Sequence, residues 1–318
     1  MEGIARRQPP RVILVLGAGG PVGSAFHAGA LAALHAVSAW DPRTAPWIVG
    51  TSAGAQVGAW LRAGATAADL KARLLGAPLS AAGLQLLGNA VRPEERFSPP
   101  QSPPRWPASR QYLASPRLRP LPWATGRLLA ALLPEGRRSP ARMAADFQRA
   151  FGSRWPERPL WVTALQLDSG QRVVFGHPNA PKADVPTAVM SSSAVPGYSQ
   201  PVRLGAHRYV DAGVLSATHV DLLDAPPLAS LEPELIVVSS PLSRFRPLRA
   251  TLRWQLKRLQ ARRDTPFLLL EPSAHVNRAM GRNPMDPTRA ARVAAVTYYD
   301  LRHRLQHSQL LSPLDAAS

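Results

Sequence analysis

Cysteine is absent from all 318 residues of the chain. This excludes a disulfide framework, a thiolate nucleophile and a metal site with cysteine ligands. Acidic residues are also scarce, with 20 Asp and Glu against 38 Lys and Arg, which gives a formal net charge of +18. Such an excess is typical of contact with a polyanion, or of an arginine-rich composition that only fills the surface. The sequence has no recognisable nucleic-acid module, so we expect no nucleic-acid partner and leave open a peripheral contact with an anionic membrane surface.

Long apolar runs are missing as well. No segment reaches the ~20 apolar residues of a membrane-spanning helix, and residues 1–11 lack the apolar core of a signal peptide. We therefore expect a cytoplasmic location. No histidine pair has metal-ligand spacing with a carboxylate partner, so neither a metal nor another cofactor is expected. Hydrophobic residues make up 45% of the chain, enough for a large core, and residues 1–318 are expected to form a single domain.

Short apolar runs alternate with helical patterns along the first 75 residues. The runs Val12–Leu16 and Trp47–Val49 predict strands, and helices are predicted for 24–39, 55–62 and 67–75. Further strands are expected at 160–166 and 172–175, which form a hairpin, and at 235–238 and 266–270. This order predicts an α/β protein with three layers, in which helices cover both faces of a parallel-rich central sheet.

The segment from 91 to 140 differs in composition from the rest of the chain, because prolines and arginines are interleaved throughout it. Proline removes amide donors and disfavours a helical residue before it, so loops and short helices such as 124–133 are expected. We interpret the segment as an insertion or lid. Its residues Trp106 and Trp123 suit an interfacial membrane contact.

Two helices are expected in the C-terminal third of the chain. Residues 248–262 have the pattern of a basic amphipathic helix, and residues 287–306 that of a long terminal helix, with Asp286 as its N-cap.

Ser52 is the strongest candidate for a catalytic nucleophile. It is the central residue of Gly50-Thr51-Ser52-Ala53-Gly54, between a predicted strand and a predicted helix. A G-x-S-x-G sequence in this context is typical of a nucleophile elbow, in which Gly50 and Gly54 let the backbone turn sharply beneath the serine.

Two further motifs supply groups that a serine nucleophile needs. The amides of Gly17, Ala18, Gly19 and Gly20, at the start of a helix, can stabilise an oxyanion. Asp211 ends a predicted strand ahead of Ala212-Gly213 and is the candidate base. Carboxyl ends of strands are where open α/β sheets place their sites.

Four motifs in order resemble the patatin-like phospholipases: residues 17–20, 50–55, 192–196 and 209–213. The resemblance implies a lipid acyl hydrolase that needs no calcium and uses a Ser-Asp dyad without a histidine. It assigns Ser52 as nucleophile, Asp211 as base, and Gly17, Ala18, Gly19 and Gly20 to the oxyanion hole, with a phospholipid or other acyl-ester lipid as substrate. The chain departs from the family pattern at Ala18, at Val22 and at Ala212, which requires a negative φ.

Three other interpretations remain open at this stage. Ser52 and Asp211 could form a Ser-His-Asp triad with His219 or His275, as in α/β-hydrolase esterases. Residues 17–23 with Asp41 could bind a nucleotide, although Val22 occupies the position of the last glycine. A protein of the same fold could also bind lipids without turnover.

Overall fold

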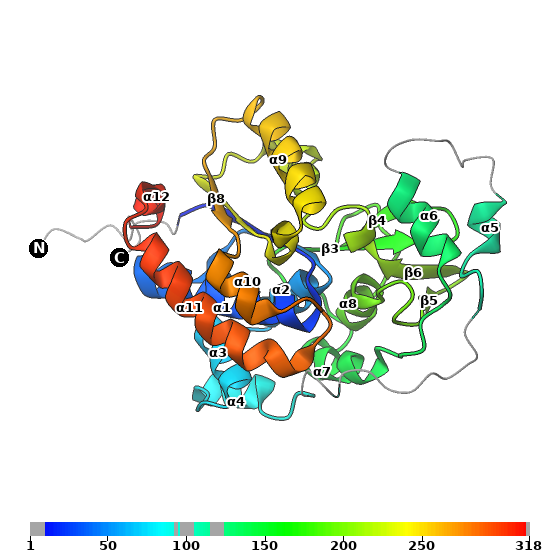
Figure 1. The fold of residues 1–318 in the computed structure, drawn as a ribbon, viewed down its shortest axis with the longest axis horizontal. Helices are drawn as coiled ribbons and strands as arrows, with labels where there is room; N and C mark the ends of the chain where they lie inside the picture. The colour runs from blue at the N-terminus through cyan, green and yellow to red at the C-terminus, as the bar shows by residue number, and fades with distance from the viewer. Residues whose placement is uncertain (1–9, 92–94, 96–104, 115–123, 316–318) are drawn as a thin grey trace, which may run out of the picture.

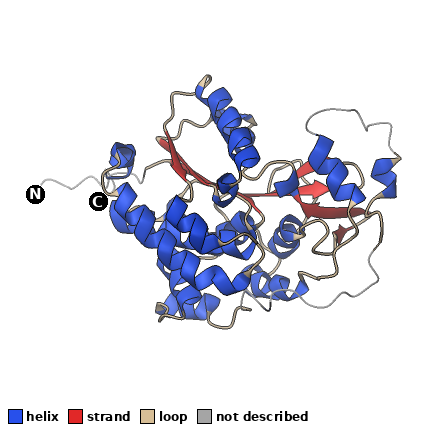
Figure 2. Ribbon diagram, viewed as in Figure 1, coloured by secondary structure: helices blue, strands red, loops and turns tan. Residues whose placement is uncertain are grey.

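The computed structural model describes residues 10–91, 95, 105–114 and 124–315. They form one sheet of eight strands with helices on its two faces (Figures 1 and 2). The strands are β1 (Val12–Leu16), β2 (Trp47–Thr51), β3 (Leu160–Gln166), β4 (Gln171–Phe175), β5 (Val202–Leu204), β6 (His207–Asp211), β7 (Leu235–Ser239) and β8 (Phe267–Leu270). Their order is β5-β6-β3-β2-β1-β7-β8, and β4 pairs with β3.

The centre of the sheet is parallel and one end is antiparallel. Strands β3, β2, β1, β7 and β8 pair in parallel, whereas β4 and β6 pair antiparallel with β3, and β5 pairs antiparallel with β6. The predicted parallel-rich sheet and the β3–β4 hairpin are confirmed. Leu16 is in register with Gly50 on one side and with Ser239 on the other, so the segments that follow β1, β2 and β7 meet at one edge of the sheet.

Alternate side chains of the central strand enter two different cores. Val12, Leu14 and Leu16 belong to the larger core, whereas Ile13 and Val15 belong to the smaller one. Buried residues of these helices contribute to the larger core: α1 (Gly20–Ser38), α2 (Ala53–Arg62), α3 (Ala67–Leu75), α4 (Ala81–Leu87), α7 (Ala141–Phe151), α8 (Val185–Ser193), α10 (Ala274–Met280) and α11 (Ala290–Leu305).

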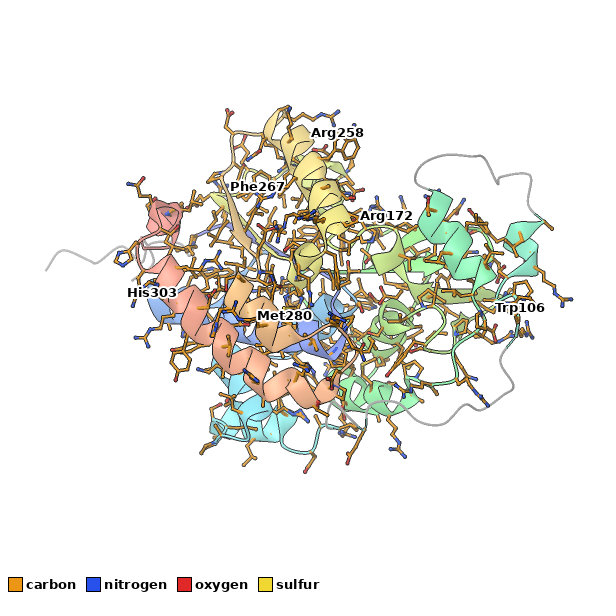
Figure 3. The ribbon with its side chains drawn as sticks, in the orientation of Figure 1. Trp106, Arg172, Arg258, Phe267, Met280 and His303 are labelled. Carbon is orange, nitrogen blue, oxygen red and sulfur yellow. The ribbon has the colours of Figure 1, made fainter. Side chains whose placement is uncertain are left out.

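The second face of the sheet is covered by α9 (Arg246–Gln260) with the 3-10 turns η4 (Val220–Asp224) and η5 (Leu228–Ser230). Figure 3 labels one residue from each core: Phe267 of β8 packs in the core under α9, and Met280 of α10 packs in the larger core. The strands are therefore covered on both faces, as expected for a three-layer α/β/α protein.

Helix boundaries agree with the sequence pattern to within a few residues. The first helix begins at Gly20 rather than at residue 24, because Pro21 is tolerated in the first turn, where its missing amide has no helical acceptor. At the C-terminus, a 3-10 turn, η7 (Pro287–Arg289), precedes α11, and the side chain of Asp286 accepts a hydrogen bond from the amide of Thr288. Asp286 therefore caps this turn, whereas Arg289 is the residue directly before α11.

Part of the proline-rich insertion lies against β6. Its described elements are α5 (Arg110–Leu113) and α6 (Ala124–Leu132), whereas Trp123 lies outside the described residues. The guanidinium of Arg208 on β6 donates to Glu135 at 2.7 Å, to the carbonyl of Ala108 at 2.9 Å and to Asp168. Arg208 thereby connects two segments of the insertion to the strand that carries Asp211. Of the described helices, none is long and apolar enough to cross a membrane.

Candidate active site

Ser52 lies between β2 and α2 in a backbone conformation that is rare for a residue with a side chain. Its φ is 54° and its ψ is −116°, values that persist only when the surrounding structure enforces them. Two glycines make room for this turn. A Cβ at Gly54 would lie 2.0 Å from the carbonyl oxygen of Leu16, and a Cβ at Gly50 would lie 2.6 Å from Cα of Ala55. The geometry of residues 50–54 is therefore that of a nucleophile elbow.

Asp211, the last residue of β6, lies beside Ser52. The Ser52 hydroxyl donates a hydrogen bond to its carboxylate, and the amide of Gly213 donates to Oδ1 at 2.7 Å. Both residues are buried, with 3% of Ser52 and 5% of Asp211 exposed. Burial raises the pKa of Asp211 to about 6, because desolvation of the carboxylate outweighs the two hydrogen bonds that lower it. The carboxyl group is thus ionised at neutral pH and is basic enough to accept a proton.

Ala212 takes the position where the family pattern has a glycine. The residues that have a positive φ and a side chain, within the described ranges, are Ala39, Ser52 and His219. Ala212 therefore has a negative φ, as its side chain requires, and it begins the 3-10 turn η3 (Ala212–Val214).

The end of α8 holds both Ser52 and Asp211. The amide of Ser52 donates to Oγ of Ser192 at 2.8 Å, and the amide of Asp211 donates to the carbonyl of Ala194 at 2.9 Å. Between them, Oγ of Ser193 accepts a hydrogen bond from the side chain of Gln56 at 3.0 Å. The third sequence motif, residues 192–196, thus positions the two residues of the candidate dyad relative to each other.

The glycine-rich loop after β1 presents fewer amides than the sequence suggests. The amide of Gly17 donates to the carbonyl of Ser239 at 2.9 Å, and that of Ala18 donates to the carbonyl of Ala217 at 2.7 Å. These two predicted oxyanion-hole donors are therefore already engaged. The amides of Gly19 and Gly20 donate to no acceptor within the part of the chain that the structure describes. Gly20 has a φ of 61° and begins α1, where amides point out of the helix end.

His27 of α1 supports this loop from beneath. Its ring is fully buried, with Nε2 at 2.7 Å from the carbonyl oxygen of Gly17 and Nδ1 at 2.7 Å from Oγ of Ser239. Burial lowers the pKa of His27 to about 4, so the ring is neutral at pH 7. Because a carbonyl can only accept, the proton lies on Nε2, and Nδ1 accepts from Ser239. The sequence analysis missed this contact, and the only local signal is a polar residue among the small residues of the first helix.

The histidines that could complete a triad lie elsewhere. His219 is buried, but its Nε2 is 3.1 Å from the carbonyl oxygen of Ala212 and its Nδ1 is 3.1 Å from the guanidinium of Arg172. Burial lowers the pKa of His219 to about 4. His275 is exposed on α10 and contacts Arg278. The structure thus brings neither ring to the carboxylate of Asp211 or the hydroxyl of Ser52, which argues against a Ser-His-Asp triad.

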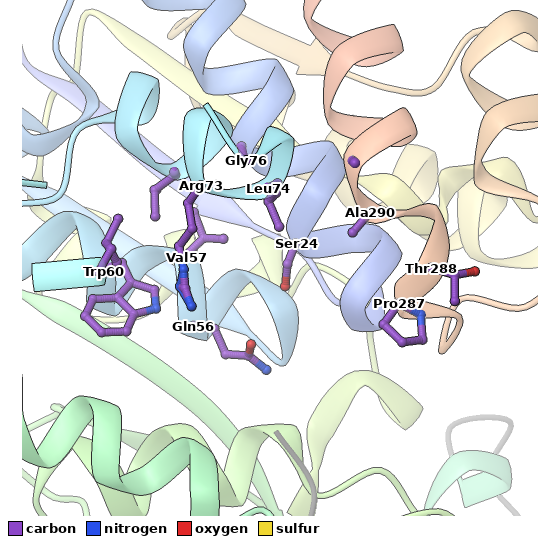
Figure 4. Close-up of a pocket in the computed structure, with 14 residues that line it drawn as sticks. Ser24, Gln56, Val57, Trp60, Arg73, Leu74, Gly76, Pro287, Thr288 and Ala290 are labelled. Atoms are coloured by element: carbon purple, nitrogen blue, oxygen red, sulfur yellow. The ribbon is translucent and has the colours of Figure 1, made fainter. Parts of the chain in front are cut away.

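A cavity of about 520 Å³ lies beside the elbow, between α1, α2, α3 and the start of α11. Gln56, one helical turn after Ser52, and Ser24, one turn after Gly20, contribute polar groups to its lining (Figure 4). Apolar side chains line most of the remainder: Ala28, Val57, Trp60, Leu70, Leu74, Leu87, Ala290 and Ala291. Among the residues described, no group of three His, Cys, Asp or Glu could hold a metal ion.

The comparison with family models agrees with the motifs. A family model described as patatin-like phospholipase matches residues 14–224, a range that contains Ser52, Asp211 and the glycine-rich loop after β1. No curated protein matches the chain. Among solved structures, VipD from Legionella pneumophila is similar at 14% identity and a TM-score of 0.43, over 95% of this chain and 67% of that one. The type III effector protein ExoU is similar at 20% identity and a TM-score of 0.35, over 96% of this chain and 54% of that one.

Proposed function

The chain belongs to the patatin-like phospholipase family, and we propose that it cleaves acyl ester bonds of phospholipids or related lipids with Ser52 as nucleophile and Asp211 as base. Membership of the family makes the chain an ester-cleaving lipid hydrolase; the proposal concerns the residues and the mechanism. One observation carries it: the Ser52 hydroxyl, at the apex of the elbow, donates directly to the Asp211 carboxylate.

The first half of the reaction acylates Ser52. As Oγ attacks the ester carbonyl carbon, its proton moves to the Asp211 carboxylate, whose raised pKa favours the transfer. The carbonyl oxygen becomes an oxyanion, which the amides of Gly19 and Gly20 at the start of α1 would stabilise. When the bond to the leaving oxygen breaks, Asp211 returns the proton to that oxygen, and an alcohol such as a lysophospholipid departs.

The second half hydrolyses the acyl-enzyme. A water molecule gives a proton to Asp211 as its oxygen attacks the acyl carbon, and the oxyanion forms again at the same amides. Collapse of this intermediate breaks the bond to Oγ of Ser52, which recovers its proton from Asp211. One carboxyl group therefore carries the proton in both halves, and no histidine is required.

The cavity beside Gln56 suits the acyl chain of a lipid. Its lining is mostly apolar, and each CH₂ group that leaves water contributes about 0.8 kcal/mol to binding. Because Ser52 directly precedes α2 and Gln56 lies in the first turn of that helix, a chain in this cavity would have its ester end near the nucleophile. We assign the cavity to the acyl chain on this basis.

A fluorophosphonate probe tests the nucleophile. Mass spectrometry of the labelled protein should find the probe on Ser52, and the Ser52→Ala variant should remain unlabelled. Hydrolysis of p-nitrophenyl acyl esters should then depend on both Ser52 and Asp211. A probe attached to another serine would overturn the assignment, and a wild-type protein that binds lipid vesicles without hydrolysing any ester would support the lipid-binding alternative.

A further inference from the structure

Helix α9 has one face that packs on the sheet and one that is strongly basic. Leu252, Leu256 and Leu259 are buried against the sheet, which leaves the opposite side in solvent. We define this exposed side, the basic face of α9, as Arg246, Arg249, Arg253, Trp254, Lys257 and Arg258. The helix contains no Asp or Glu at all. From the geometry and charge of this face, we propose that it docks the protein on an anionic lipid bilayer.

Only part of this positive charge is neutralised within the protein. Glu271 lies 2.5 Å from Arg253 and 4.0 Å from Arg249. For Arg246, Lys257 and Arg258, no carboxylate in the described ranges lies within ion-pair distance. Uncompensated cations on one helix face match the negative surface potential of a bilayer that contains anionic lipids.

Two exposed aromatic residues accompany these cations. Phe245, directly before α9, is 37% exposed, and Trp254, in the middle of its basic face, is 42% exposed. The guanidinium of Arg258 lies over the Trp254 ring at 4.8 Å from its centroid. Aromatic rings next to arginine and lysine are typical of surfaces that reside at the headgroup level of a membrane. They distinguish this face from a purely electrostatic contact surface.

The basic face lies beside a polar cavity of about 850 Å³. Trp254 and Arg258 line it together with Arg127 and Arg172 (Figure 3 labels Arg172 and Arg258). Asp221 and Asp224 line it as well, and Asp221 pairs with Arg172 at 2.6 Å. Guanidinium groups form charge-assisted hydrogen bonds with phosphate oxygens. A phosphate-rich headgroup layer against α9 would therefore meet arginines on the helix and in the cavity beside it.

Helix α9 is also connected to the candidate active site. The 3-10 turn η6 (Pro241–Arg244) leads into α9, and a Cβ at Gly19 would lie 2.9 Å from the ring of Pro241. On the helix itself, Gln255 accepts a hydrogen bond at 3.4 Å from Ser216, in the segment after Asp211. Docking through α9 would thus hold the active-site edge of the sheet close to the lipid surface. The orientation of the active site toward the lipid rests on the proposed function, but the binding experiment does not require turnover.

The experiment measures cosedimentation with vesicles of phosphatidylcholine, with and without phosphatidylserine. The Ser52→Ala background prevents any hydrolysis of the lipid. In this background, Arg246→Ser, Lys257→Ser and Arg258→Ser are combined. The matched control combines Arg142→Ser, Arg154→Ser and Arg302→Ser, which remove the same charge from exposed positions on and near α7 and α11. Those two helices contribute to the core on the other face of the sheet.

Loss of three cations from the docking face should weaken binding to phosphatidylserine vesicles roughly 100-fold, whereas the control should bind nearly as wild type. Binding should also weaken as salt is added. In an otherwise wild-type chain, the same triple variant should hydrolyse a short soluble ester at an unchanged rate, which shows that it folds. Trp254→Ala should weaken vesicle binding further.

Three results would overturn the proposal: equal weakening by the two triple variants, wild-type binding that does not depend on phosphatidylserine, or a triple variant that loses affinity for single-stranded RNA and keeps its affinity for vesicles. Because binding is measured in Ser52→Ala, a failure of the proposed chemistry would appear only in the ester assay and would leave the vesicle result interpretable.

Discussion

The hydroxyl group of Ser52 donates a hydrogen bond to the carboxylate of Asp211, and no histidine lies between them. The two residues come from different strand ends, β2 and β6, and the end of α8 holds both through their backbone amides. A direct pair of this kind requires a carboxyl group basic enough to take the proton of a serine, and the burial of Asp211 supplies that basicity.

Replacing Asp211 with Asn should lower kcat roughly 10²- to 10⁴-fold, because the amide cannot accept the proton of Ser52. Steady-state hydrolysis of a soluble p-nitrophenyl ester measures the effect. The control is His219→Asn, since asparagine tolerates the left-handed backbone of residue 219, where φ is 52°. If His219→Asn were as damaging as Asp211→Asn, a histidine-dependent mechanism would be favoured.

The activity should depend on pH through the ionisation of Asp211. Only the carboxylate can act as base, and burial raises the pKa of Asp211 to about 6. We expect kcat/KM to be low in acid, to rise through pH 6 and to level off above pH 7. A profile measured with a substrate whose own ionisation lies outside this range tests it. An inflection near the ordinary carboxyl value of 3.8 would contradict the raised pKa.

The same burial predicts that Asp211→Asn stabilises the fold at neutral pH. The folded pKa of about 6 exceeds the ordinary value of 3.8, so the ionised form is disfavoured in the folded state. The stability that Asp211 contributes is fully present below pH 3.8 and is lost as the pH rises to about 6. At pH 8 the variant should be more stable by on the order of 3 kcal/mol, and this advantage should vanish near pH 4. Urea denaturation at both pH values measures it, and an advantage that does not change with pH would argue against this origin.

Gly20→Ala should damage catalysis more than stability alone explains. A Cβ there would lie 2.6 Å from the carbonyl oxygen of Pro284, so the loop must shift and displace a proposed oxyanion donor. The loss of one such donor lowers kcat roughly 10²- to 10³-fold. Gly205→Ala is the matched control, because Gly205 has a similar φ of 58° with no atom within 4 Å of the added Cβ. Similar kinetics for the two variants would exclude a catalytic role for the Gly20 amide.

His27→Phe should lower kcat with little change in KM, since the ring holds Gly17 and Ser239 beneath the glycine loop. The variant leaves buried polar groups without partners, which costs about 1–3 kcal/mol of stability for each group. Ser38→Ala removes another buried hydrogen bond of α1, to Leu34 at the far end of the helix, and should lower stability without a change in kcat. A loss of kcat in both variants would indicate only a general loosening of the helix.

The order of the sequence patterns was sufficient to predict the architecture and the nucleophile elbow, because both depend on local patterns. Apolar runs of four or five residues predicted the strands β1, β7 and β8, and the glycines around Ser52 predicted a turn whose crowded geometry admits no Cβ at positions 50 and 54. The position of Asp211 at the end of β6 followed from the same reasoning.

Contacts between distant segments could not be predicted in this way. The amides of Gly17 and Ala18 were candidate oxyanion donors, but their acceptors, Ser239 and Ala217, lie more than 190 residues away in the chain, and only the folded sheet brings them together. The role of His27 was hidden in part for the same reason, since Ser239 of β7, one of its two partners, is 212 residues away in the chain.

The tripeptide Ser192–Ala194 fixes the distances between functional groups of the candidate site. Because three consecutive residues hold the nucleophile, the base and Gln56, the spacing of these groups does not depend on the peripheral loops. Changes in the length or composition of the proline-rich insertion should therefore leave the separation of the reacting oxygens unchanged. Substitutions in these three residues, by contrast, would move several functional groups at once.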